Sequence, residues 1–190
     1  MNQGSIIAPA IAPVIAVVGP SGVGKDSVMA ALAVRDPRLR LQRRVITRPE
    51  QAGSEPFTGV TPKTFARMAA AGAFALHWQA HGLSYGIPVE IYDLRKGARA
   101  VLVNLSRTVL GAAQGLFEDL IVLSLTADPE VLADRLAARG REDAGERARR
   151  LERASAPLPE GLHRVIEVDN SGPLATTVET VLTRLQPESV

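Results

Sequence analysis

The sequence contains no cysteine, and this absence excludes several functions at once. Disulfide bridges, thiolate-ligated zinc and catalysis by a thiol all require that side chain. The three histidines are scattered, without the spacing of metal ligands. No apolar segment is long enough to predict a membrane-spanning helix, so no membrane partner is expected. The apolar stretch 6–18 lacks a positively charged start, which argues against a signal peptide and favours a cytoplasmic protein.

Lysine is rare as well. Only Lys25, Lys63 and Lys96 are lysines among the 22 basic residues, and the remainder are arginines. The formal net charge is only +2, so no nucleic-acid partner is expected. Arginine is the planar, bidentate phosphate binder, although a GC-rich genome would produce the same bias. The composition leaves oligomeric state open, with a homodimer as an alternative to a monomer.

The strongest signal lies in residues 14–27. Val14–Val18 is short and β-branched, which predicts a buried parallel strand. The next residues, Gly-Pro-Ser-Gly-Val-Gly-Lys, have P-loop spacing, and a helix-competent stretch follows. In such a loop, backbone N–H groups, the helix N-terminus and the lysine all face phosphate oxygens. The predicted triphosphate-binding residues are Gly19, Pro20, Ser21, Gly22, Val23, Gly24, Lys25, Asp26 and Ser27. The alternative, a glycine-rich turn that binds nothing, is weakened by the preceding strand.

One position departs from the P-loop pattern. Asp26 stands where a Ser or Thr normally ligates Mg²⁺, and a hydroxyl follows only at Ser27. A carboxylate is also a good Mg²⁺ ligand, directly or through water. Asn104 follows a predicted buried strand at a place where many P-loop proteins carry a metal-directed Asp. The sequence therefore offers Asp26 as the metal partner.

Strand and helix patterns alternate along the chain, which predicts an α/β fold. Repeated β-α units imply a doubly wound parallel sheet with its ligands at the carboxyl ends of the strands. The predicted strands are 14–18, 41–46, 100–103, 120–125 and 165–168, with short strands within 74–85. The first predicted helix begins at Asp26. The other predicted helices cover 61–72, 88–96, 107–117, 128–139, 142–154 and 173–185. We expect a flexible leader over 1–13 and one domain over 14–190, with an acceptor-binding insert at about 48–90.

Several strings, taken in order, resemble the guanylate kinase superfamily and, within it, the ribose 1,5-bisphosphate phosphokinases. The P-loop resembles both groups, and Lys25-Asp26-Ser27 is similar to the phosphokinase form. The other matching strings are Ile46-Thr47-Arg48, the segments 65–74 and 82–86, and the arginines of a lid at about 135–152. These arginines are Arg135, Arg139 and Arg150. A solvated, salt-bridged helix is the alternative interpretation of this charged segment.

The resemblance implies a P-loop NTPase of guanylate kinase type, with an acceptor-binding insert and a lid. It implies transfer of the γ-phosphoryl group of Mg·ATP to ribose 1,5-bisphosphate, giving 5-phospho-α-D-ribose 1-diphosphate (PRPP) and ADP in phosphonate breakdown. ATP and Mg²⁺ are the implied cofactors, and a phosphorylated sugar is the implied partner. The implied catalytic residues are Lys25, Arg135, Arg139 and Arg150. The implied acceptor-binding residues are Arg44, Arg48, His81, Tyr85, Asn104 and Arg107, with Asn170 as an adenine neighbour.

Three departures from guanylate kinases bear on the acceptor. Leu76 stands in place of a glutamate that grips guanine, Arg44 in place of a small hydroxyl residue, and Gln51 in place of an arginine. An apolar group and a cation suit a remote phosphate better than a base edge. The open alternatives are a nucleoside monophosphate kinase such as guanylate kinase, and a non-catalytic binding module of the same fold.

Overall fold

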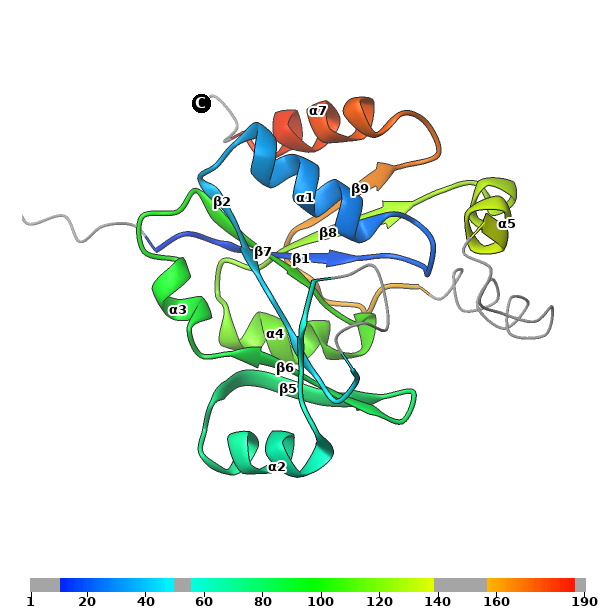
Figure 1. The fold of residues 1–190 in the computed structure, drawn as a ribbon. Coiled ribbons are helices and arrows are strands. Elements are labelled where there is room, and N and C mark those ends of the chain that lie inside the picture. The colour runs from blue at the N-terminus through cyan, green and yellow to red at the C-terminus, as the bar shows by residue number, and fades with distance from the viewer. Residues whose placement is uncertain (1–10, 50–55, 139–156, 187–190) are drawn as a thin grey trace, which may run out of the picture.

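The computed structural model describes residues 11–49, 56–138 and 157–186 (Figure 1). Its centre is a five-stranded sheet in the order β2-β7-β1-β8-β9. Every neighbouring pair in this sheet is parallel, which confirms the predicted doubly wound α/β fold. The strands are β1 (Val14–Val18), β2 (Leu39–Gln42), β7 (Ala100–Asn104), β8 (Ile121–Thr126) and β9 (Val165–Asp169).

Helices cover both faces of this sheet. In Figure 1, α1 (Lys25–Arg35) and α7 (Leu174–Arg184) lie on one face, and α4 (Leu110–Leu116) lies on the other. Alternate residues of β1 enter the two apolar clusters, with Ile15 and Val17 in one and Ala16 in the other. A strand buried on both faces must be apolar at every position, which explains its uninterrupted hydrophobic run.

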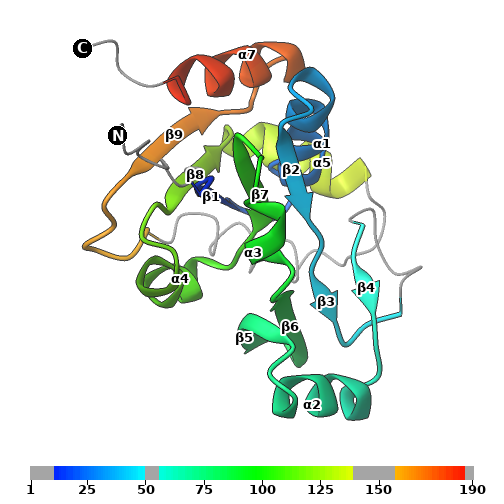
Figure 2. The same ribbon diagram turned by 90° about the vertical axis from the view of Figure 1, so that its left-hand side faces the viewer.

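The segment predicted as an insert forms a second sheet together with β3, which precedes it, in the order β4-β3-β6-β5. Figure 2 shows its strands near α2 (Pro62–Ala70), whose first turn is capped by the Thr61 side chain accepting from Thr64 N–H. The strands are β3 (Val45–Ile46), β4 (Thr58–Gly59), β5 (Phe74–Ala80) and β6 (Leu83–Pro88). Leu76, Trp78 and Ile87 of this sheet belong to the same apolar cluster as Val103 of the parallel sheet. The two sheets therefore share one core.

Two predicted elements are wrong in their extent. The predicted strand over 41–46 is two strands, because β2 pairs with β7 in the parallel sheet while β3 pairs with β6 in the second sheet. Arg43 and Arg44 lie between them. The predicted helix over 88–96 contains only α3 (Ile91–Leu94), since Pro88 still pairs with Phe74 at the end of β6. In both cases tertiary strand pairing overrides a local pattern.

The remaining predicted elements are present within the described residues. The segment 107–117 begins as a short 3-10 helix, η1 (Arg107–Val109), and continues as α4. Helix α5 (Pro129–Ala138) follows β8. The predicted helix over 142–154 lies outside the described residues. None of the described helices combines the length and hydrophobicity that a membrane span requires.

A charged cluster closes the end of α1 that is remote from the P-loop. The Asp36 carboxylate accepts from Arg38 Nε at 3.0 Å and from Arg99 Nη1 at 2.9 Å. A main-chain hydrogen bond connects the same two segments, since the Arg99 N–H donates to the Arg38 carbonyl oxygen at 2.8 Å. The hydrogen bonds from Arg38, and then from Arg99, hold the pKa of Asp36 well below its usual range. This cluster joins α1 to the chain that enters β2 and β7.

Candidate active site at the carboxyl edge of the parallel sheet

The P-loop connects the carboxyl end of β1 to α1, as the sequence predicts. Gly24 caps the helix with a left-handed backbone (φ 95°), and a Cβ there would lie 2.8 Å from Asn170 Nδ2. At Gly19, where φ is 150°, a Cβ would lie 2.5 Å from the main-chain oxygen of Leu125. Glycine is therefore required at both ends of the loop, by backbone shape and by close neighbours.

Lys25 folds back over this loop. Its Nζ donates to the main-chain oxygens of Gly19 at 2.9 Å and of Pro20 at 3.1 Å. The ammonium group is thus anchored to the loop, at the mouth where α1 begins. This position fits the predicted contact of Lys25 with phosphate oxygens.

Asn170 supports the P-loop through its side-chain amide. Its Nδ2 donates to Val23 O at 2.7 Å, and its Oδ1 accepts from Thr177 Oγ1 at 2.7 Å. Both side chains are buried, with exposed fractions of 4% for Asn170 and 3% for Thr177. A buried amide that is paired on both ends is a rigid connection. The predicted adenine contact of Asn170 stays a prediction, while its side chain serves the loop.

Asp26 and Asn104 meet at the same edge. Asn104 Nδ2 donates to Asp26 Oδ1 at 3.2 Å, so the amide at the end of β7 orients the carboxylate on the first turn of α1. Asn104 is buried, whereas Ser27, the residue after Asp26 in α1, is exposed. Across the described ranges, no group of three or more acidic or histidine side chains could hold a metal by itself.

Helix α5 packs against the loop from the side of β8, and Figure 1 shows it beyond the carboxyl ends of β1 and β8. Arg135 Nη1 donates to Val23 O at 3.4 Å. A Cβ at Gly22 would lie 3.2 Å from the side chain of Leu136, so a larger residue there would require this side chain to shift. Of the predicted lid arginines, the structure brings Arg135 to the loop, while Arg139 and Arg150 lie outside the described residues.

The second sheet presents two arginines on aromatic rings. Arg44 is buried, and its Cζ lies 5.3 Å from the centroid of the Tyr85 ring. Arg48 Cζ lies 4.4 Å from the centroid of Phe57. The Arg48 Nε is buried, and no hydrogen-bond partner for it occurs among the residues that the structure describes. Such a buried, unpaired cationic donor is compatible with an anionic ligand.

Tyr85 was expected at the site, whereas Phe57, the ring beneath Arg48, and Trp78, the ring stacked on Tyr85, were not. Phe57 directly precedes β4, and Trp78 lies in β5. No motif marks either ring. Arg48 and Phe57 are nine positions apart, and no local sequence rule pairs a cation with a ring at that spacing.

The other predicted acceptor residues lie on separate elements. His81 occupies the exposed turn of the β5–β6 hairpin, in a left-handed backbone with φ 52°. Arg107 opens η1 after β7, and burial lowers the pKa of its guanidinium, which stays protonated at neutral pH. Leu76 is buried in the shared apolar cluster, so its position provides packing in place of a polar contact.

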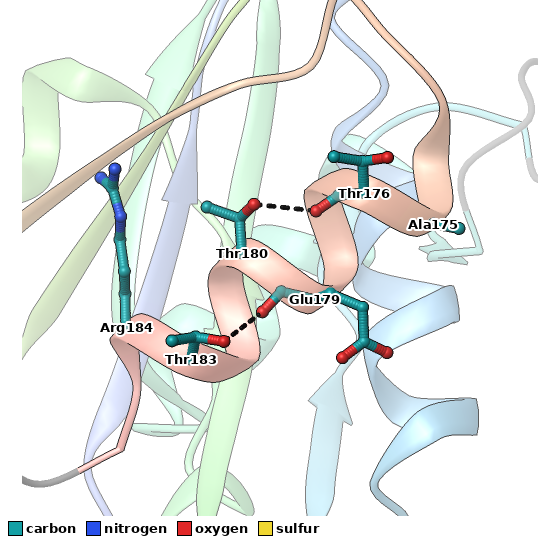
Figure 3. Close-up of a pocket in the computed structure, with 6 residues that line it drawn as sticks. All are labelled: Ala175, Thr176, Glu179, Thr180, Thr183 and Arg184. Carbon is teal, nitrogen blue, oxygen red and sulfur yellow. Dashed lines mark hydrogen bonds between the residues drawn. The ribbon is translucent and has the colours of Figure 1, made fainter.

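A depression elsewhere on the surface lacks the chemistry of a site. Figure 3 shows it along the exposed face of α7, where the Thr180 and Thr183 hydroxyls donate to the main-chain oxygens of Thr176 and Glu179. These hydroxyls serve the helix itself and converge on no common point. The residues that line the depression are Ala175, Thr176, Glu179, Thr180, Thr183 and Arg184.

No protein-family model matches the sequence. Curated relatives are nonetheless closely similar over nearly the whole chain. The ribose 1,5-bisphosphate phosphokinase of Ruegeria sp. is 61% identical over 180 residues, covering 95% of each chain. Its namesake in Pseudomonas fluorescens is 49% identical over 174 residues, covering 88% of this chain and 92% of that one. The Brucella melitensis protein of the same name is 42% identical over 179 residues, with 93% of each covered.

Solved structures show the same fold at lower identity. The guanylate kinase of Anaplasma phagocytophilum superposes with a TM-score of 0.64 at 17% identity, covering 93% of this chain and 85% of that one. A gluconokinase from Sinorhizobium meliloti gives a TM-score of 0.53 at 22% identity, with 92% of each chain covered. Both likenesses concern the fold alone.

Proposed function

The chain belongs to the ribose 1,5-bisphosphate phosphokinase family, and from this membership we propose that it phosphorylates ribose 1,5-bisphosphate with ATP. The products are PRPP and ADP. The observation that carries the proposal is the pair Arg44 and Arg48, two cations on aromatic rings in the second sheet. A doubly phosphorylated sugar would need two such anion-binding groups.

The reaction joins an oxygen of the acceptor's 1-phosphate to the γ-phosphorus of ATP, and the bond between that phosphorus and the β–γ bridging oxygen breaks. The acceptor oxygen is already anionic, so no general base is required. Positioning and charge neutralisation then account for most of the rate. In this proposal Lys25 and the P-loop amides hold the triphosphate.

The residues at the loop are compatible with Mg²⁺. This ion is commonly held by one or two carboxylates together with phosphate oxygens and water, and the Asp26 carboxylate is already oriented by Asn104. Asp26 would therefore hold the ion directly or through water. Bound Mg²⁺ supplies positive charge to the phosphate oxygens.

On the acceptor side, we assign Arg44 to the 5-phosphate, and Arg48 and Tyr85 to the 1-phosphate. His81, Asn104 and Arg107 would line the space between the two phosphates. This division follows from the buried position of Arg44 and from Leu76, which presents no carboxylate to a guanine base. A planar base would lose the hydrogen bonds that guanine-specific sites provide.

The lid arginines would close over the transferred group. Arg135 already lies at the loop, and by resemblance Arg139 and Arg150 would join it. Cations at this position neutralise the developing charge, and closure excludes the water that would hydrolyse ATP. We further propose one kinase domain over 14–190 after a leader at 1–13, acting in the cytoplasm as a monomer or homodimer.

A phosphorus NMR assay tests the acceptor. Purified protein with Mg·ATP and ribose 1,5-bisphosphate should develop the signal of a ribosyl diphosphate, and a parallel tube with GMP should not. Ready consumption of GMP with no change in the sugar would favour the alternative, a guanylate kinase. No phosphoryl transfer in either tube, together with absent ATP binding, would favour a non-catalytic module.

A further inference from the structure

Trp78 and Tyr85 of the second sheet form one continuous stack with Arg44, which directly precedes β3. Trp78 and Tyr85 lie face to face, with ring centroids 5.3 Å apart and an interplanar angle of 10°. Arg44 lies on the Tyr85 ring with its Cζ 5.3 Å from the centroid. Trp78 is the only tryptophan of the chain, and both it and Arg44 are about 9% exposed.

The sheet fixes the order of this stack. Trp78 and Tyr85 are directly paired across β5 and β6, and Tyr85 is paired with Ile46 of β3 on its other side. Because β6 lies between β3 and β5, Arg44, which precedes β3, approaches Tyr85 from the side opposite Trp78. Cross-strand pairs of this kind hold side chains at set distances.

Trp78 also connects the stack to the parallel sheet. It belongs to the apolar cluster that contains Val103 of β7 and Leu105, the residue directly after this strand. Tyr85 packs against the same cluster but is only half-buried, and Arg44 has the longest and most adaptable side chain. Trp78 is therefore the member of the stack that belongs to the shared core.

We propose that Trp78 is a positioning residue for the acceptor: it fixes the plane of Tyr85, and Tyr85 fixes the plane in which Arg44 presents its guanidinium donors. This inference rests on the proposed function, since it assigns Arg44 and Tyr85 to acceptor phosphates. A guanidinium held by its face directs its N–H groups along its edges, toward a phosphate in the same plane. An aromatic face covered by a cation is also closed to a stacking nucleobase.

Steady-state kinetics of Trp78→Leu and Trp78→Phe test the role. Leucine keeps an apolar side chain but removes the stack, so the acceptor KM should rise about three- to tenfold, with kcat and the ATP KM unchanged. Phenylalanine restores a ring and should bring the acceptor KM back to within about twofold of wild type. Tyr92→Leu is the matched control, because Tyr92 is an aromatic residue of α3 outside the second sheet, and it should change neither KM.

Intrinsic fluorescence gives a second test that needs no variant of Trp78. Emission excited at the red edge of the spectrum comes from Trp78 alone. Ribose 1,5-bisphosphate should change this emission in a saturable way, ATP should leave it unchanged, and Arg44→Ala should abolish the change. If Trp78→Leu fails to fold, this titration and Trp78→Phe decide the question.

The outcomes separate the inference from the proposed function. Wild-type protein that leaves the bisphosphate unphosphorylated overturns the proposed function. An active wild type whose Trp78→Leu variant keeps its acceptor KM overturns the positioning role alone. A rise of both KM values in Trp78→Leu, together with a lowered melting temperature, would identify Trp78 as a packing residue and overturn the proposal. Trp78 fluorescence that does not change when the acceptor is added would overturn it equally.

Discussion

At the P-loop the cationic side chains are held by main-chain oxygens, whereas in the second sheet they lie on aromatic rings. Lys25 and Arg135 donate to carbonyls of the loop, at distances from 2.9 to 3.4 Å. Arg44 and Arg48 instead lie over Tyr85 and Phe57. The first arrangement depends on backbone shape, and the second depends on which side chains the sheet presents.

This difference separates what is general from what is specific in the molecule. A cradle of main-chain groups recognises phosphate whatever nucleoside carries it, so it tolerates little change and suits many kinases. Rings and guanidinium groups are single-residue choices that can be exchanged without altering the backbone. We therefore expect acceptor specificity to reside in the second sheet, and substitutions should affect one substrate or the other.

The largest effect is expected from Lys25→Ala. Loss of the ammonium group removes charge stabilisation from the transferred phosphoryl group, so kcat should fall about 100- to 1000-fold, with weakened ATP binding. Coupled assays of ADP release measure the rate, and calorimetry measures the binding. Lys63→Ala is the matched control, since Lys63 is an exposed lysine of α2, and it should leave both values unchanged. Retained activity in Lys25→Ala would refute the P-loop mechanism.

Arg44→Ala should weaken acceptor binding and leave ATP binding unchanged. Loss of a charge-assisted hydrogen bond to phosphate should raise the acceptor KM about 10- to 100-fold, while the ATP KM stays within twofold, about the scatter of such measurements. Arg44→Lys keeps the charge but not the planar stack, so an intermediate KM is expected. Arg40→Ala, an exposed arginine of β2, serves as the control. Equal losses for both substrates would erase the distinction between the two sides.

Asn170→Ala should weaken nucleotide binding alone, because Asn170 supports the P-loop. Without the amide, the Val23 carbonyl and the Thr177 hydroxyl lose a buried partner, and the ATP KM should rise about tenfold while the acceptor KM is unchanged. Thr177→Val removes only the second of these hydrogen bonds and should have a smaller effect. Kinetics at saturating acceptor, with melting temperatures for each variant, measure the difference. An unchanged ATP KM would show that the loop keeps its shape unaided.

Asp36→Asn should affect neither substrate, because Asp36 lies at the end of α1 remote from the P-loop. The folded-state pKa of Asp36 is lowered, so its carboxylate stabilises the fold above about pH 4 and loses this contribution as the pH falls below that value. The difference in unfolding free energy between wild type and Asp36→Asn should be constant near neutral pH and shrink in acid. Urea unfolding at several pH values checks this. A difference that grows in acid would contradict the assigned sign.

The sequence predicted the P-loop side closely, because backbone conformation there is encoded locally. Val14–Val18, the glycines and Lys25 lie within twelve residues, and the strand, turn and helix appear where expected. Thr61 and Pro62 likewise mark the start of α2 by capping rules that need no tertiary information.

The acceptor side was less predictable, because it depends on contacts between distant residues. Residues 41–46 contain no break signal, yet the chain leaves one sheet and enters another at Arg43 and Arg44. The ring beneath Arg44 comes from Tyr85, and nothing in the local sequence pairs them. Asn170 shows the same limit at the P-loop, since its amide reaches Val23 only after the last strand has joined the sheet.

The hydrogen bond between Asn170 and Val23 spans 147 positions of the chain. Because synthesis runs from the amino to the carboxyl terminus, the ribosome makes the P-loop early and Asn170, which supports it, late. A nascent chain that has not released β9 and α7 therefore carries the phosphate motif without the support that shapes it. ATP binding would then begin only after β9 and α7 have emerged and joined the rest of the fold.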